Sequence, residues 1–125
     1  MAHILLIDDD EAFRTLLYEM LIGVGHTVAS ATNGLDALKL FRACPADLIL
    51  TDIKMPYDGL ATIRILRAEH PKLGIIAMSG GSEVRLDYAR SLGAQRTLTK
   101  PFTTEELTAA IAEVLALPGD MSAAS

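Results

Sequence analysis

The chain has 125 residues, of which 50% are apolar and 22% are charged, a composition typical of one globular domain with its own core. Acidic residues outnumber basic ones by 16 to 11, and the net charge of -5 disfavours binding to nucleic-acid phosphates or anionic membranes. The chain has a single cysteine, Cys44, which excludes an internal disulfide. No apolar run approaches the ~20 residues that a membrane helix needs. Both features favour a cytoplasmic protein.

Short apolar runs alternate along the chain with longer segments of helical periodicity. The first run, His3 to Ile7, ends at three consecutive aspartates. A parallel strand that is buried on both faces reads as a continuous apolar run of this kind. We therefore expect strands over residues 3–7, 26–31, 48–51, 73–78 and 95–99.

Apolar residues recur at helical spacing in each interval between these runs, and again after the last run. The second helix follows Asn33, and its expected inner face is formed by Leu35, Leu38 and Phe41. The last helix opens with a capping box over residues 103–106, in which threonine and glutamate side chains satisfy backbone N–H groups. The pattern thus predicts a helix after every strand.

Strict alternation of strand and helix indicates an α/β domain with a single doubly wound, five-stranded parallel sheet and helices on both faces. We assign residues 1–117 to this domain and residues 118–125 to a flexible tail or linker stub. In such sheets, ligands bind beyond the carboxyl ends of the strands, near the point where the winding reverses. The residues that follow the strands are therefore the candidate functional residues.

Asp8 and Asp9, Asp52, Ser79 and Lys100 each follow an expected strand. Three carboxylates at one sheet edge repel one another unless a cation joins them, and ligands that are all oxygen favour Mg2+. The lysine offers a positive charge, and the serine a hydrogen-bond donor, to the same bound group. The combination indicates a phosphoryl-transfer site in which Asp52 is the nucleophile.

Ser79 also lies in a pattern related to the nucleophile turn of the α/β serine hydrolases, because it ends an apolar run and precedes Gly80. Those enzymes need an acid and then a histidine later in the chain. Here His3, His26 and His70 all precede Ser79. The order of residues therefore excludes the hydrolase interpretation.

The same positions resemble the receiver domain of bacterial two-component response regulators. Each motif alone is weak, but together, in order and at strand ends, they make a strong signal over about residues 3–117. The motifs are Asp8-Asp9, Asp52-Ile53-Lys54-Met55-Pro56 with Asp58-Gly59 behind it, Ser79-Gly80, and Lys100-Pro101-Phe102. The resemblance implies a flavodoxin-like sheet with the strand order 2-1-3-4-5.

The resemblance also implies which residues hold the metal and the phosphoryl group. Asp52 resembles the acceptor that becomes an aspartyl phosphate. Asp9 and Asp52 would bind Mg2+ directly, Asp8 would bind it through water, and Lys54 would bind it through its backbone carbonyl. The implied cofactor is therefore Mg2+.

Two further residues would bind the transferred group. Ser79 would close on a phosphoryl oxygen once the group is present. Lys100 would pair with Asp52 in the free state and with the phosphate afterwards, and in relatives the peptide bond between Lys100 and Pro101 is cis.

The activity implied by the resemblance is signal transduction by phosphorelay. A sensor histidine kinase or a histidine phosphotransfer protein would donate a phosphoryl group to Asp52. The modified domain would then switch its binding to an output partner, an output domain or a second copy of itself. Such a domain is not an enzyme toward other substrates, since it catalyses only its own phosphorylation and dephosphorylation.

The sequence departs from the family pattern at two places. Thr97 stands three positions before Lys100, where receivers usually carry an aromatic residue whose rotamer reports phosphorylation. In the loop after Pro56, Tyr57 alone precedes Asp58, where the family has two residues. The alternative function is therefore a degenerate receiver, an interaction module that binds partners without being phosphorylated. Binding of Mg2+ together with the phosphate mimic beryllofluoride distinguishes the two.

Overall fold

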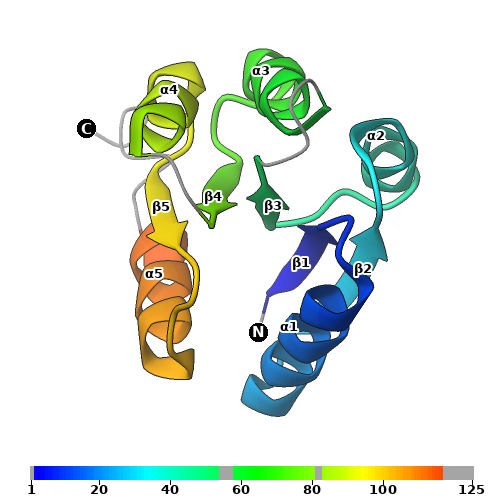
Figure 1. Cartoon of the computed structure of the whole chain (residues 1–125). Helices are drawn as coiled ribbons and strands as arrows, with labels where there is room; N and C mark the ends of the chain where they lie inside the picture. The colour runs from blue at the N-terminus through cyan, green and yellow to red at the C-terminus, as the bar shows by residue number, and fades with distance from the viewer. Residues whose placement is uncertain (1, 54–57, 81–82, 117–125) are drawn as a thin grey trace.

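The computed structural model describes residues 2–53, 58–80 and 83–116, in which strands and helices alternate (Figure 1). The elements are β1 (His3–Ile7), α1 (Glu11–Val24), β2 (Thr27–Ala31), α2 (Gly34–Ala43), β3 (Leu48–Asp52), α3 (Asp58–Glu69), β4 (Gly74–Ser79), α4 (Glu83–Leu92), β5 (Arg96–Thr99) and α5 (Thr104–Ala116). Within these residues, no helix is long and apolar enough to cross a membrane. The tail expected over residues 118–125 and the Lys54 carbonyl lie outside the described residues.

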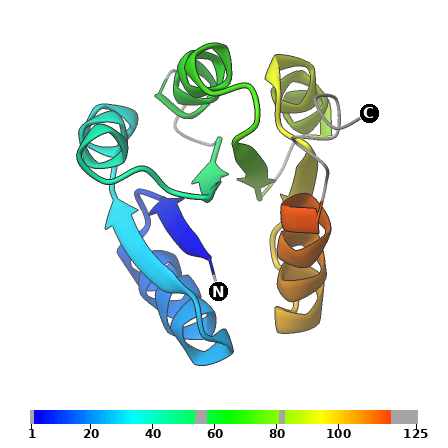
Figure 2. The same cartoon turned by 180° about the vertical axis from the view of Figure 1, so that it is seen from behind.

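The strands form one sheet in the order β2-β1-β3-β4-β5, and every neighbouring pair is parallel. Helices α1 and α5 cover one face of this sheet, and α2, α3 and α4 cover the other (Figures 1 and 2). The predicted fold class and strand order are therefore confirmed. Because the chain winds outward from β1 to β2 and then returns to β3, the winding reverses between β1 and β3, which places a candidate ligand site at their carboxyl ends.

Two apolar clusters fill the space between the sheet and its helices, one on each face. Alternate residues of β1 enter opposite clusters, so that Leu5 and Ile7 pack under α2, α3 and α4, while Ile4 and Leu6 pack under α1 and α5. The whole lengths of β3 and β4 are buried. Burial on both faces is the physical reason that these strands read as continuous apolar runs in the sequence.

Side-chain caps fix where two of the helices begin. Asn33 accepts a hydrogen bond from the backbone N–H of Asp36, 2.9 Å away, at the start of α2. At the start of α5, Thr103 Oγ1 accepts from the backbone N–H of Glu106 at 3.0 Å, and Glu106 Oε1 accepts from the backbone N–H of Thr103 at 2.8 Å. The expected capping box is therefore present, with both of its hydrogen bonds.

One expected core position in α2 is wrong. Leu35 is 63% exposed, whereas the buried residues of the helix are Gly34, Ala37 and Phe41. At 100° per residue these three lie on one line of the helix surface, and Leu35 is turned away from that line. The buried face therefore combines two small residues with Phe41, and the expected Leu38 packs against the same cluster while only partly buried.

Candidate functional site

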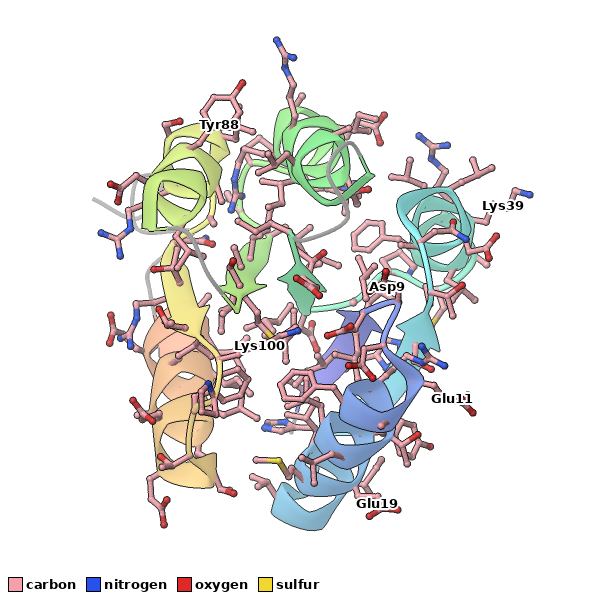
Figure 3. The ribbon with its side chains drawn as sticks, in the orientation of Figure 1. Asp9, Glu11, Glu19, Lys39, Tyr88 and Lys100 are labelled. Atoms are coloured by element: carbon pink, nitrogen blue, oxygen red, sulfur yellow. The ribbon has the colours of Figure 1, made fainter. Side chains whose placement is uncertain are left out.

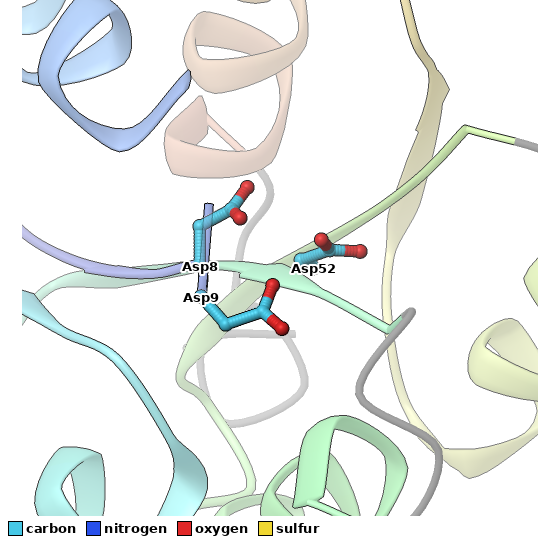
Figure 4. Close-up of side chains that lie close together, drawn as sticks. All are labelled: Asp8, Asp9 and Asp52. Carbon is cyan, nitrogen blue, oxygen red and sulfur yellow. The ribbon is translucent and has the colours of Figure 1, made fainter. Parts of the chain in front are cut away.

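Three carboxylates meet at the carboxyl ends of β1 and β3 (Figure 4). Asp8 follows β1, and its backbone N–H donates to the carbonyl of Ala31 at 3.1 Å, which continues the pairing with β2. Asp52 is itself the last residue of β3 and still pairs with Met78 of β4. As a result, one carboxylate oxygen from each of Asp8, Asp9 and Asp52 lies within 4.8 Å of the others.

The three consecutive aspartates after β1 have three different environments. Asp8 is fully buried, and its Oδ1 accepts from the backbone N–H of Asp10 at 2.9 Å. Asp9 is exposed and belongs to the acidic cluster. Asp10 is the N-cap of α1, where its side chain accepts from the backbone N–H of Phe13 at 3.2 Å. The start of α1 therefore holds the Asp8 carboxylate in place through the Asp10 backbone.

Lys100 lies between the two buried acids of the cluster. Its Nζ is 3.0 Å from Asp8 Oδ2 and 3.1 Å from Asp52 Oδ2, and its side chain is 17% exposed. The backbone N–H of Lys100 donates to the carbonyl of Ser79 at 2.8 Å, which holds the loop after β5 against β4. The peptide bond between Lys100 and Pro101 is cis, as the family resemblance implied.

Burial and charge act against each other in this cluster. Burial raises the pKa of Asp8, and the nearby charge of Asp52 adds a smaller increase. Hydrogen bonds from the Asp10 backbone and from Lys100, together with the charge of Lys100, lower this pKa. Burial is the largest of these influences, and the pKa of Asp8 lies above its usual value. Burial alone would lower the pKa of Lys100, but its bonds to Asp8 and Asp52 outweigh burial and raise it. The lysine ammonium is therefore an integral part of the acidic cluster.

The donor set fits a hard divalent cation such as Mg2+. Three carboxylate oxygens that approach within 4.8 Å supply only oxygen ligands. Among the described residues, the Lys100 ammonium pairs with Asp8 and Asp52, and it balances only part of the charge of the three acids. The fourth ligand implied by the resemblance, the Lys54 carbonyl, belongs to residues that the structure does not describe.

Ser79 lies at the end of the strand next to β3. It is the last residue of β4 and is 5% exposed. The pairing of Asp52 with Met78 places Ser79 one position further along the neighbouring strand. Four of the candidate side chains, those of Asp8, Asp9, Asp52 and Lys100, thus come together directly, and Ser79 borders them through the backbone contact to Lys100.

Two aromatic rings beside the site were not predicted from the sequence. The ring centroid of Phe13 lies 4.2 Å from Lys100 Nζ, and Phe102 meets the same ring edge to face at 5.8 Å between centroids. In the sequence, Phe13 is one of several apolar residues at helical spacing, so its periodicity indicates only a core position. Its place one turn after the acidic pair is the signal that could have revealed the contact.

Thr97, which stands where relatives carry an aromatic residue, is hydrogen-bonded to α4. Arg90 Nη2 donates to Thr97 Oγ1 at 3.2 Å. Thr97 is half-buried in β5 and pairs with Ala77 of β4. The hydroxyl therefore connects the edge strand β5 to α4.

Comparisons with known proteins agree with this geometry. The family model for the response regulator receiver domain matches residues 4–112. The chain is 37% identical over 109 residues to the DNA-binding transcriptional regulator NtrC of Escherichia coli, and 36% identical over 115 residues to the transcriptional regulatory protein ZraR of Klebsiella oxytoca. These alignments cover 84% and 90% of this chain but only 23% and 26% of the relatives, so the chain spans about a quarter of their length.

Solved structures show the same fold. NtrX from Brucella abortus, in complex with ADP, superimposes with a TM-score of 0.86 at 28% identity, over 91% of this chain and 27% of that one. A response regulator receiver domain protein from Clostridium thermocellum superimposes with a TM-score of 0.84 at 28% identity, over 92% of this chain and 94% of that one. With the family model matching most of its length, the chain belongs to the response regulator receiver domains of two-component systems.

Proposed function

We propose that this domain accepts a phosphoryl group on Asp52 and that the modification switches its binding to a partner. The observation that carries the proposal is the position of the Asp52 carboxylate, which is 1% exposed, lies 3.1 Å from the Lys100 ammonium and has oxygens of two further acids within 4.8 Å. A carboxylate so placed at a strand end is fixed for attack on an incoming phosphorus atom. The presence of all five candidate residues disfavours the degenerate receiver.

The reaction is a phosphoryl transfer from a phosphohistidine. An oxygen of Asp52 attacks phosphorus, a P–O bond forms as the donor's P–N bond breaks, and the departing imidazole keeps the electron pair and takes up a proton. Lys100 then pairs with a phosphoryl oxygen, and the Ser79 hydroxyl donates to another. A magnesium ion held by Asp8, Asp9 and Asp52 would supply positive charge against the phosphoryl oxygens.

The proposed donor is a sensor histidine kinase or a histidine phosphotransfer protein. The longer relatives are named as transcriptional regulators, and this chain matches about a quarter of their length. We accordingly propose that the phosphorylated domain acts on an output domain or on a separate output partner. A cytoplasmic location stays a prediction from cysteine usage.

Acetyl phosphate with Mg2+ tests this function without a kinase. Intact-mass spectrometry is expected to show one added phosphoryl group that is stable in acid and lost in base. Asp52→Asn should abolish the label, while the matched change Asp36→Asn at an exposed position of α2 should leave it unchanged. A label that persists in Asp52→Asn would contradict the proposed acceptor. An unlabelled wild type that also fails to bind beryllofluoride would support the degenerate receiver.

Neutralising Asp9, the exposed acid of the cluster, is expected to raise the stability of the metal-free domain and to lower its affinity for Mg2+. Asp9→Asn should stabilise the metal-free domain by about 1 kcal/mol, because it removes one of three mutually repelling charges. The same change should weaken Mg2+ binding at least tenfold, since it removes a charged ligand. Thermal unfolding with and without millimolar Mg2+ measures both effects.

Glu19→Gln is the matched control for this pair of measurements. It removes another exposed acid, from the second half of α1 and away from the acidic cluster, and should change neither the metal-free melting temperature nor the response to Mg2+ (Figure 3). If Asp9→Asn lowers the metal-free stability, repulsion within the cluster is not the dominant effect at this edge.

A further inference from the structure

The face of an aromatic ring closes one side of the Lys100 ammonium. Phe13, in the first turns of α1, has its ring centroid 4.2 Å from Lys100 Nζ, well within the range of a cation–π contact. The same nitrogen bonds to Asp8 at 3.0 Å and to Asp52 at 3.1 Å. Lys100 lies between α1 and α5 at the edge of the sheet (Figure 3). The ammonium is thus enclosed by two carboxylates and one ring.

The Phe13 ring is itself held in place by a second ring. Phe102 meets it with an interplanar angle of 81° and a centroid distance of 5.8 Å, which is the favoured edge-to-face arrangement. Both side chains pack against the apolar cluster under α1 and α5. Lys100 and Phe102 flank Pro101, so the loop that carries the lysine also carries the support for the ring that touches it.

The charged partners of Lys100 change during the proposed reaction, while the ring does not. Asp52 becomes an acyl phosphate whose negative charge lies on the phosphoryl oxygens, and Asp8 would share its charge with a divalent cation, so both ion pairs of the free state are rearranged. The Phe13 ring carries no net charge and takes part in neither event. Its contact with the ammonium therefore stays available while the lysine exchanges a carboxylate partner for a phosphoryl oxygen.

We propose that Phe13 is a positioning residue for phosphoryl transfer, which holds the Lys100 ammonium beside the acceptor through the face of its ring. This inference rests on the function proposed for Asp52. It gives α1 a second role in the geometry of the site, beside the hydrogen bond from its N-cap residue to Asp8, through a contact that involves neither the metal nor the transferred group.

Fluorination of the Phe13 ring tests the electrostatic part of the contact. Fluorine atoms withdraw charge from the ring face with little change in its volume, so site-specific incorporation of mono-, di- and trifluorophenylalanine weakens a cation–π contact in steps. The rate of phosphorylation by acetyl phosphate at saturating Mg2+ and the affinity for beryllofluoride should fall progressively, by about fivefold at the trifluoro ring. The same series at Phe41, which packs against His70 in the opposite cluster, should leave both unchanged.

The proposal would be overturned if fluorination of Phe13 changed neither the phosphorylation rate nor the affinity for beryllofluoride. If Phe13→Leu still slowed phosphorylation in that case, the shape of the ring, and not its charge distribution, would explain the effect. Phe13→Trp should retain most of the rate because it keeps an aromatic face. A double-mutant cycle of Phe13→Leu and Lys100→Met, in which urea unfolding gives the stability of each variant, measures the coupling energy between the ring and the ammonium without any phosphorylation. A wild type that takes no label on Asp52 refutes the proposed function, whereas zero coupling in the cycle refutes the ring contact.

Discussion

Lys100→Met is expected to lower the free energy of unfolding of the metal-free domain by about 3–5 kcal/mol at neutral pH. The lysine is the cation that the structure places between the carboxylates of Asp8 and Asp52, at 3.0 Å and 3.1 Å. Methionine retains the apolar stem of the side chain but leaves both buried acids facing each other without an ammonium. Urea unfolding followed by circular dichroism measures the difference, and Mg2+ should restore part of it.

The loss should depend on pH with a definite sign. The pKa of Asp8 is raised by burial in the folded state, so its contribution to stability is present below its ordinary pKa of 3.8 and is lost as pH rises through the folded value. Removing Lys100 removes two influences that lower this pKa, and raises it further. The variant should therefore approach wild-type stability at acid pH and fall furthest behind at neutral pH.

The wild type should also lose stability in strong alkali. The pKa of Lys100 is raised above 10.5 in the folded state, so the stability contributed by its charge is fully present below 10.5 and is lost as pH rises through the folded value. Lys39→Met, at an exposed position of α2, should change stability by less than about 0.5 kcal/mol throughout. An equal loss for Lys100→Met at pH 4 and pH 7 would show that packing, and not charge, explains the effect.

The topology was predictable because burial on both faces leaves a readable pattern. β3 and β4 are buried along their whole length, and their sequences are unbroken apolar runs apart from the polar residues at their ends. Once these strands are placed, right-handed crossovers allow few arrangements of the remaining elements. The side chains at the strand ends then fall at one edge without any further information.

The inner face of α2 was not predictable in the same way. Leu35 has the larger apolar side chain, yet Gly34 and Ala37 are buried and Leu35 is 63% exposed. The helical period fixes which residues share a face, but the distance between α2 and the sheet decides whether large or small residues fit on it. That distance depends on the packing of the whole layer and not on the segment alone.

The same limit applies to the candidate site. Asp8, Asp52 and Lys100 could be selected individually because each stands at a strand end, but one ammonium shared between two carboxylates requires residues 92 and 48 positions apart to converge. The Phe13 contact has no counterpart in the periodicity, since a core residue and a residue beside the site occupy the same helix face. The position of a residue at a strand end is thus enough to predict that it belongs to the site. Contacts between side chains from the sheet and from the helices can be identified only once the fold is known.

Gly93→Ala is the second substitution with a large expected effect, a loss of about 2–4 kcal/mol in the free energy of unfolding. Gly93 follows α4 with φ of 130°, in the left-handed region that other residues rarely adopt. A Cβ built there would lie 2.6 Å from Cγ and 2.8 Å from Nε of Arg67. The substitution therefore combines backbone strain with a steric clash.

Arg67 cannot move aside cheaply to admit that methyl group. Its guanidinium donates to the Gly93 carbonyl from Nε at 3.2 Å and Nη2 at 2.8 Å, and to the carbonyls of His70 and Pro71 from Nη1 at 3.1 Å and 2.8 Å. One side chain thus satisfies carbonyl groups after both α3 and α4, where the helix dipoles favour a positive charge. Displacing it would leave these carbonyl groups without their donors, which adds to the strain at Gly93.

Gly23→Ala is the matched control, because Gly23 lies inside α1 and a Cβ there would meet nothing within 4 Å. Alanine loses less conformational freedom than glycine on forming a helix, so this substitution should stabilise the domain by about 0.5–1 kcal/mol. The two glycine-to-alanine changes should therefore shift the urea midpoint in opposite directions. If Gly93→Ala were as stable as the wild type, Arg67 would have an alternative position of equal energy. Its hydrogen bonds to the carbonyl groups after α3 and α4 would then not be needed to hold these helices in place.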